Sequence, residues 1–131
     1  MENNWKLHHV GVAIRDADKA LEYYQSLGIV TGEPKVRGGD SFKLINAQIG
    51  SIVFELIQPV HGESPQKEFI NSRGEGIDHI GFTVDDLDKE TAKLAEKGVS
   101  VIISGRFQTG GGYAYFDTRK VGNVIIELIQ W

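Results

Sequence analysis

The sequence predicts an α+β fold in which one βαβββ module occurs twice within a single domain of 131 residues. The main observation is an internal repeat, which marks a supersecondary unit used more than once. HVGVAI from His9 is matched by HIGFTV from His79, 70 residues later, and FELIQ from Phe54 is matched by IELIQ from Ile126. The second observation is the number of glycines, 16, which indicates many tight turns and hence strands.

The first module is predicted over residues 7–58. Strand 7–14 is rich in Val and Ile, and helix 17–27 follows it with apolar residues at helical spacing. Asp16 is suited to cap the start of this helix, and Gly28 is suited to the position just after its end. The helix is expected to bury Ala17, Ala20, Leu21, Tyr24 and Leu27, and three strands are expected near 30–37, 41–49 and 51–58.

The second module is predicted over residues 77–131, after a polar connection at 59–76. Within the connection, Ser64-Pro65 is expected to begin a short helix that buries Phe69 and Ile70. The module repeats the order of the first, with Asp86 and Gly98 at the ends of its helix. Its strands are expected at 77–84, 100–107, 112–117 and 123–130, and its helix at 87–97 with Leu87, Thr91, Leu94 and Ala95 on the buried face.

Composition excludes several classes of function. The net charge of −4 gives no basic excess for binding nucleic acid, and the absence of Cys excludes disulfides, thiolate metal sites and Cys nucleophiles. No apolar run has the length of a membrane span, and the N-terminus lacks the apolar core of a signal peptide. A cytoplasmic protein that acts on a small molecule, without nucleic acid or membrane, is therefore expected.

Two histidines and two glutamates occupy matching positions in the repeat. Side chains alternate along a strand, so His9 and His79 each share a face with small neighbours. Glu55 and Glu127 each interrupt an apolar strand, where an unpaired charge is costly. Because the four residues are related by the repeat, we expect His9, Glu55, His79 and Glu127 to hold one divalent metal ion, with Zn, Mn, Fe, Co and Ni as candidates.

Other motifs have simpler interpretations. His8 points away from His9 along the strand, and His61 lies in the polar connection, so neither is expected to bind the metal. Gly110-Gly111-Gly112 lacks the ending of a phosphate-binding loop and is interpreted as a turn. A metal with four protein ligands retains positions for water or substrate, which is the arrangement of a catalytic site.

The chain resembles the vicinal-oxygen-chelate superfamily, which includes glyoxalase I, bleomycin-resistance proteins, extradiol dioxygenases and methylmalonyl-CoA epimerases. The stretches that carry the resemblance are residues 8–24, 54–88 and 123–130, and the details within 54–88 are most similar to the epimerases. The resemblance implies two βαβββ modules that form a half-open mixed β-barrel around one metal. It also places the four-ligand pattern on His9, Glu55, His79 and Glu127.

The resemblance implies a metal-dependent isomerase that enolises an α-acidic carbonyl compound, with Glu127 as the base. The epimerases generally carry a Glu before the first-module Glu. The corresponding place here is near Gly39-Asp40, so Asp40 is a second candidate base. The alternatives are a glyoxalase I-type lactoylglutathione lyase and a non-catalytic small-molecule binding protein. A homodimer is also expected. An acyl-CoA substrate would find basic residues at Lys35, Arg37, Lys43, Arg106 and Arg119.

Overall fold

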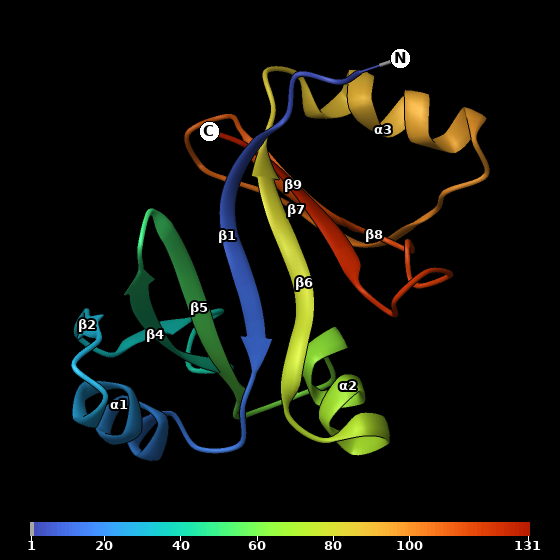
Figure 1. The fold of residues 1–131 in the computed structure, drawn as a ribbon. Helices are drawn as coiled ribbons and strands as arrows, with labels where there is room; N and C mark the ends of the chain where they lie inside the picture. The colour runs from blue at the N-terminus through green and yellow to red at the C-terminus, as the bar shows by residue number, and fades with distance from the viewer. Residues whose placement is uncertain (1) are drawn as a thin grey trace. The chain divides into compact units, whose positions relative to one another are not determined.

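The computed structural model describes residues 2–131, and its secondary structure follows the predicted order (Figure 1). The described residues form nine strands in an open mixed sheet and three helices, which confirms the α+β class. The second module has the predicted βαβββ order, and the first has one additional strand. The elements are β1 (Lys6–Ala13), α1 (Ala17–Ser26), β2 (Val30–Thr31), β3 (Lys35–Arg37), β4 (Phe42–Ile49), β5 (Ile52–Pro59), α2 (Pro65–Arg73), β6 (Gly76–Thr83), α3 (Leu87–Glu96), β7 (Val101–Arg106), β8 (Gly112–Phe116) and β9 (Ile125–Gln130).

The described residues divide into two compact units. Residues 9–78 form one, called the module-one unit, and residues 2–8 together with 79–131 form the other, called the module-two unit. Each unit is described by itself below. None of the helices in the described part of the chain has the length and apolar character that a membrane crossing requires.

The module-one unit orders its strands β2-β4-β5-β1, with β3 also pairing with β4. β1 is parallel to β5, and β4 is antiparallel to β5. α1 covers one face of these strands, and its core contains Ile14, Ala17, Ile45 and Leu56. The helix begins where the Asp16 side chain accepts a hydrogen bond from the backbone N–H of Lys19, as an N-cap residue does.

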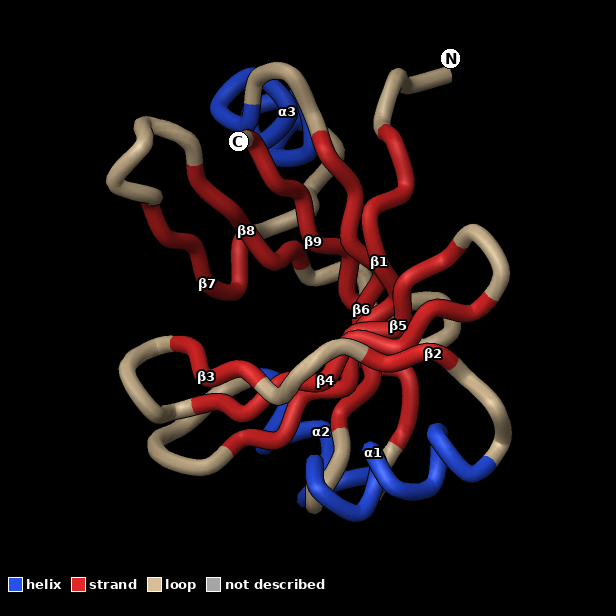
Figure 2. Tube along the Cα trace, turned by 90° about the vertical axis from the view of Figure 1, so that its left-hand side faces the viewer, coloured by secondary structure: helices blue, strands red, loops and turns tan. Residues whose placement is uncertain are grey.

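The module-two unit repeats this plan with the strand order β6-β9-β8-β7. β6 is parallel to β9, β8 is antiparallel to both β9 and β7, and the β7–β8 hairpin turns through residues 107–111 (Figure 2). The core against α3 contains Val84, Leu87, Ala114, Phe116 and Leu128. Asp86 caps α3 through the backbone N–H of Lys89, as Asp16 caps α1.

The structure corrects the predicted strand at 30–37, which is two short strands, β2 and β3. Both pair with β4 but are separated by Gly32-Glu33-Pro34. The interruption follows from Pro34, which has no N–H to donate to a ladder, and from Gly32, which weakens a strand interior.

Some residues predicted to be buried on the helices are exposed. Leu27, which is 57% exposed, follows the last residue of α1 and so lies past its buried face. On α3, Ala95 is exposed and Glu90 is buried instead, because the indole of Trp5 packs in the same unit and donates to the Glu90 carboxylate. α2 begins at Ser64-Pro65 as predicted, but Phe69 and Ile70 are only half-buried.

Candidate functional site

In the module-two unit, adjacent parallel strands bring His79 and Glu127 together. The Cα register of β6 and β9 pairs Gly81 with Glu127, and residues two apart on a strand share a face. His79 and Glu127 therefore lie on one face, and Gly81, which is paired with Glu127, has no side chain there. The His79 Nε2 atom is 3.5 Å from Glu127 Oε1. His79 is fully buried and Glu127 is 8% exposed.

Tyr115 completes this face of the module-two unit. It lies directly opposite Glu127 in the antiparallel β8–β9 register, and its ring centroid is 5.0 Å from that of His79. Sequence reasoning did not select Tyr115. The signal was present in the alternation of Tyr113 and Tyr115 with Ala114 and Phe116, since the latter two belong to the core on the opposite face.

The module-one unit repeats this arrangement with His9 and Glu55. The parallel register of β1 and β5 pairs Gly11 with Glu55, so His9 shares the face of the carboxylate, as His79 does in the other unit. Asn46 of β4 lies opposite Glu55, where the second module has Tyr115. His9 is buried and Glu55 is half-buried. Thus the sequence repeat corresponds to a repeated placement of one imidazole, one glycine and one carboxylate.

The spacing of His79 and Glu127 in the module-two unit fits two ligands of one divalent metal ion. Both residues are buried, and in the module-one unit His9 is also buried and also offers a ligand atom. Two ligand atoms at about 2.0–2.2 Å from one ion lie roughly 3–4 Å apart. The 3.5 Å between His79 Nε2 and Glu127 Oε1 falls within that range. The neighbours of Glu127 on its face, Ile125 and Ile129, are both buried, so this carboxylate needs a cationic or hydrogen-bonding partner.

Asp40, the second candidate base, lies on the turn between β3 and β4 of the module-one unit. Its side chain is 84% exposed, and its Oδ2 atom is 3.7 Å from the Nε2 atom of His61. The His61 side chain is also exposed, which matches the expectation that it is solvated. The structure thus places Asp40 on a solvated turn beside His61 rather than on the face that carries Glu55.

Three of the five basic residues expected to be available to an acyl-CoA are occupied by neighbouring carboxylates. Lys43 pairs with Asp18 at 2.7 Å, and Arg106 pairs with Asp88 at 2.8 Å. The remaining pair is that of Arg119 with Asp117 at 2.9 Å. The hydrogen bond from the Arg119 side chain is the largest cause that lowers the pKa of Asp117 below its ordinary value.

The other two basic residues, Lys35 and Arg37, lie on β3 and are exposed. Within residues 2–131 no carboxylate forms an ion pair with either of them.

Comparisons with known proteins identify the family to which the chain is similar. Residues 6–116 match the model of the Glyoxalase/Bleomycin resistance protein/Dioxygenase superfamily. The chain is 27% identical to the uncharacterised protein YqjC of Bacillus subtilis, covering 95% of this chain and 91% of that protein. It is 29% identical to the ethylmalonyl-CoA/methylmalonyl-CoA epimerase of Cereibacter sphaeroides, covering 95% and 97%. The crystal structure of the methylmalonyl-CoA epimerase from Mycobacterium tuberculosis matches with a TM-score of 0.77 at 25% identity, covering 99% and 92%.

Proposed function

Because the chain belongs to the Glyoxalase/Bleomycin resistance protein/Dioxygenase superfamily, we propose that it is a metal-dependent isomerase that enolises an α-acidic acyl thioester. Methylmalonyl-CoA epimerisation is the nearest named activity. The observation that carries this proposal is the buried His79–Glu127 pair, whose geometry is repeated by His9 and Glu55. The likeness to the Cereibacter sphaeroides epimerase, which extends over nearly all of both chains, supports the substrate class.

In this proposal His9, Glu55, His79 and Glu127 hold one divalent ion, such as Zn, Co, Ni or Mn. The two imidazoles bind in their neutral form, and the two carboxylates bind ionised. A bound ion would supply Lewis-acid stabilisation of the carbonyl oxygen as charge develops on it.

The proton chemistry belongs to the carboxylates. An α-proton of a thioester is weakly acidic, so its removal needs a base within hydrogen-bonding reach. We assign this role to Glu127, whose carboxylate accepts the α-proton and releases it to solvent. Glu55, its counterpart in the repeat, would take up a proton from solvent and deliver it to the opposite face of the α-carbon, so that one proton leaves and one is added. Asp40 is a weaker candidate because its carboxylate is solvated.

We further propose that the protein is a homodimer, lies in the cytoplasm and acts on an acyl-CoA. Unpaired strand edges are commonly covered by association between chains. The exposure of Val101 and Ile103 on the edge strand β7, by about two fifths each, supports a contact there. Sedimentation of the purified protein would measure the number of chains per particle.

The test is exchange of the α-proton with solvent. The protein, loaded with each candidate metal in turn, is incubated with methylmalonyl-CoA in deuterated buffer, and deuterium at the α-carbon is followed by mass spectrometry. Incorporation that requires a metal is expected. His61→Ala is the matched control, because His61 is exposed and stands outside the proposed ligand set.

The same preparation separates the alternative activities. If no branched acyl thioester exchanges its α-proton and the hemithioacetal of methylglyoxal is turned over, the protein is a lyase of the glyoxalase I type. Tight binding of a small molecule without exchange or turnover would identify a binding protein. Either result contradicts the proposed isomerase.

A further inference from the structure

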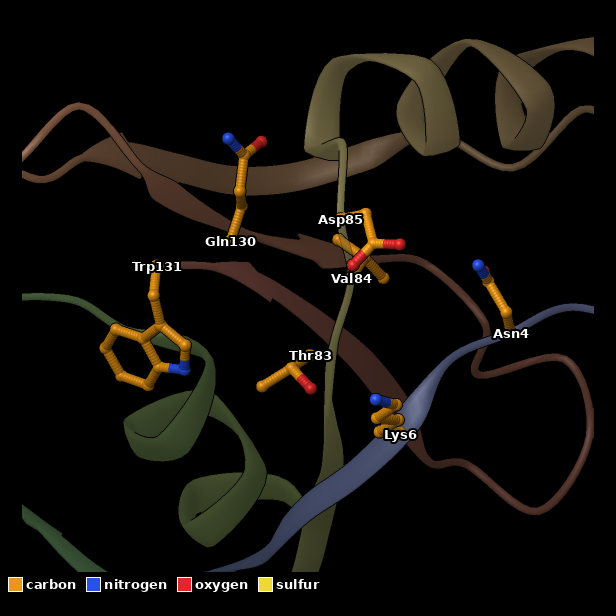
Figure 3. A pocket seen from close by; sticks show the side chains of 7 residues that line it. All are labelled: Asn4, Lys6, Thr83, Val84, Asp85, Gln130 and Trp131. Atoms are coloured by element: carbon orange, nitrogen blue, oxygen red, sulfur yellow. The ribbon is translucent and has the colours of Figure 1, made fainter.

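A cavity of about 460 Å³ opens at the end of β9 in the module-two unit (Figure 3). All of its lining residues belong to that one unit. They are Asn4, Lys6, Thr83, Val84, Asp85, Gln130 and Trp131. The lining combines an indole ring, an ammonium group, a hydroxyl, two carboxamides and one carboxylate. Its volume lies within the range of small-molecule sites, and its lining is more polar than is usual for them.

The cavity lies on the same face as the His79–Glu127 pair. Thr83 pairs with Ile129 in the β6–β9 register, two residues beyond the Gly81–Glu127 level. Alternation along β6 and β9 places Thr83 and Trp131 on the side that carries His79 and Glu127. At about 3.3 Å per residue, the cavity extends from roughly 7 to 13 Å beyond Glu127 along the strand.

Trp131 is held in place although 67% of its surface is exposed. Its ring stacks on Phe107 with a centroid distance of 5.6 Å and an interplanar angle of 16°, and it contacts His8 at 5.5 Å. The β7–β8 turn can lie close to the end of β9 because residue 111 is a glycine. A Cβ atom at Gly111 would collide with the Gln130 carbonyl oxygen. An aromatic ring fixed in this way loses little conformational entropy when a ligand packs on it.

The polar groups of the cavity suit a neutral chain that contains amides and ends in an anion. Gln130 uses its Oε1 atom to accept from the backbone N–H of Leu87, so its amide NH₂ remains a donor. Asn4 offers both a donor and an acceptor, and Asp85 offers an acceptor. No ion pair involves Lys6 or Asp85 within the described residues 2–131, so the Lys6 ammonium can meet an anionic group.

We infer that this cavity is the subsite for the pantetheine arm of an acyl-coenzyme A, an inference that rests on the proposed function. With the α-carbon at Glu127, the first amide of the arm lies about six bonds away, the length of two extended residues or roughly 7 Å, which is the level of Thr83. The second amide lies about four bonds further along the cavity. The gem-dimethyl group beyond them packs on Trp131, and the phosphate approaches Lys6. The subsite thus selects the carrier of the acyl group, separately from the residues that act on the α-carbon.

The test compares two thioesters of the same acid, methylmalonyl-CoA and methylmalonyl-N-acetylcysteamine, which lacks the arm beyond its first amide. Trp131→Ala and Lys6→Ala are each expected to raise KM for the CoA thioester about tenfold with kcat unchanged. Neither is expected to change kcat/KM for the short thioester by more than about twofold. Lys97→Ala, which removes an exposed ammonium of the same unit away from the cavity, is the control.

The subsite is wrong if Trp131→Ala and Lys6→Ala lower kcat/KM equally for both thioesters, or lower it for neither. It is also wrong if Lys35→Ala, rather than Lys6→Ala, raises KM for the CoA thioester. Calorimetric titration with coenzyme A keeps this test separate from the proposed chemistry. If the wild type binds coenzyme A and Trp131→Ala weakens that binding, the subsite stands even where no proton exchange occurs. If the wild type does not bind coenzyme A, the inference is wrong whatever the exchange assay shows.

Discussion

Glu127 combines three properties that a catalytic base requires. It is 8% exposed, it lies 3.5 Å from the imidazole of His79, and the residue paired with it on β6, Gly81, has no side chain. A buried carboxylate is costly unless it has a partner, and a cation bound between Glu127 and His79 would offset that cost. A conservative substitution of Glu127 is therefore expected to lower the rate of proton exchange while the fold is retained.

Glu127→Gln is expected to lower the rate of α-proton exchange by about 10²–10⁴-fold, because the amide keeps the size of the side chain but cannot accept the proton. The measurement is deuterium incorporation at saturating substrate, with far-UV circular dichroism to show that the fold is retained. Glu96→Gln on the exposed end of α3 is the matched control. Exchange in Glu127→Gln within threefold of the wild type would exclude Glu127 as the base.

At the scale of the elements, the β7–β8 hairpin depends on close packing across its strands. Gly105 lies opposite Tyr113, and a Cβ atom at Gly105 would lie 2.6 Å from a ring carbon of that tyrosine. The Tyr113 ring in turn stacks near Phe107, at a centroid distance of 6.0 Å. Gly105 therefore lets the ring of Tyr113 lie across β7.

Gly105→Ala is expected to destabilise the protein by about 1–3 kcal/mol, because the added methyl must displace the Tyr113 ring from a packed position. The free energy of unfolding in urea is the measurement. Gly32→Ala is the control, since a Cβ atom there would meet nothing within 4 Å and the backbone has no positive φ. If the two substitutions lower the free energy of unfolding equally, the predicted clash with the Tyr113 ring does not determine the stability of the hairpin.

The sequence predicted these elements well because their signals are local. Apolar spacing and the caps Asp16 and Asp86 located α1 and α3 within a residue at each end. The predicted strand at 30–37 was wrong because Gly32 and Pro34 divide it into β2 and β3, which pair with different parts of β4. Repeat symmetry identified the His and Glu positions. The alternation along β8 places Tyr115 on the face away from the core, but its position opposite Glu127 depends on the register of β8 with β9, which no local pattern gives.

At the scale of the whole chain, residues 2–8 belong to the module-two unit although module one follows them in sequence. The Trp5 indole donates a hydrogen bond of 2.7 Å to Glu90 Oε1, and its ring contacts Phe82 at a centroid distance of 5.6 Å. This hydrogen bond is the largest cause that lowers the pKa of Glu90 below its ordinary value of 4.5, and Lys93 adds to the effect while burial opposes it. Sequence analysis gave Trp5 no role because its partner is 85 residues away.

Trp5→Phe is expected to reduce the free energy of unfolding at pH 7 by about 1–2 kcal/mol, since it removes a hydrogen bond to a charged group. A carboxyl whose pKa is lowered on folding stabilises the folded state above pH 4.5, and this contribution is lost as the pH falls through the folded pKa. The difference between wild type and variant should therefore shrink below about pH 4. Urea unfolding at pH 7 and pH 3.5 measures it, and a difference that is equal at the two pH values would contradict the linkage.

The central claim is that the two repeated His–Glu sets bind one metal ion. The direct measurement is the metal content per chain of protein purified without an affinity metal or a chelator, for the wild type, Glu127→Ala and His61→Ala. About one divalent ion per chain is expected in the wild type and in His61→Ala, with loss or weakening in Glu127→Ala. A wild type that takes up no ion, even after addition of Zn, Co, Ni and Mn, would contradict the claim and with it the enolisation mechanism.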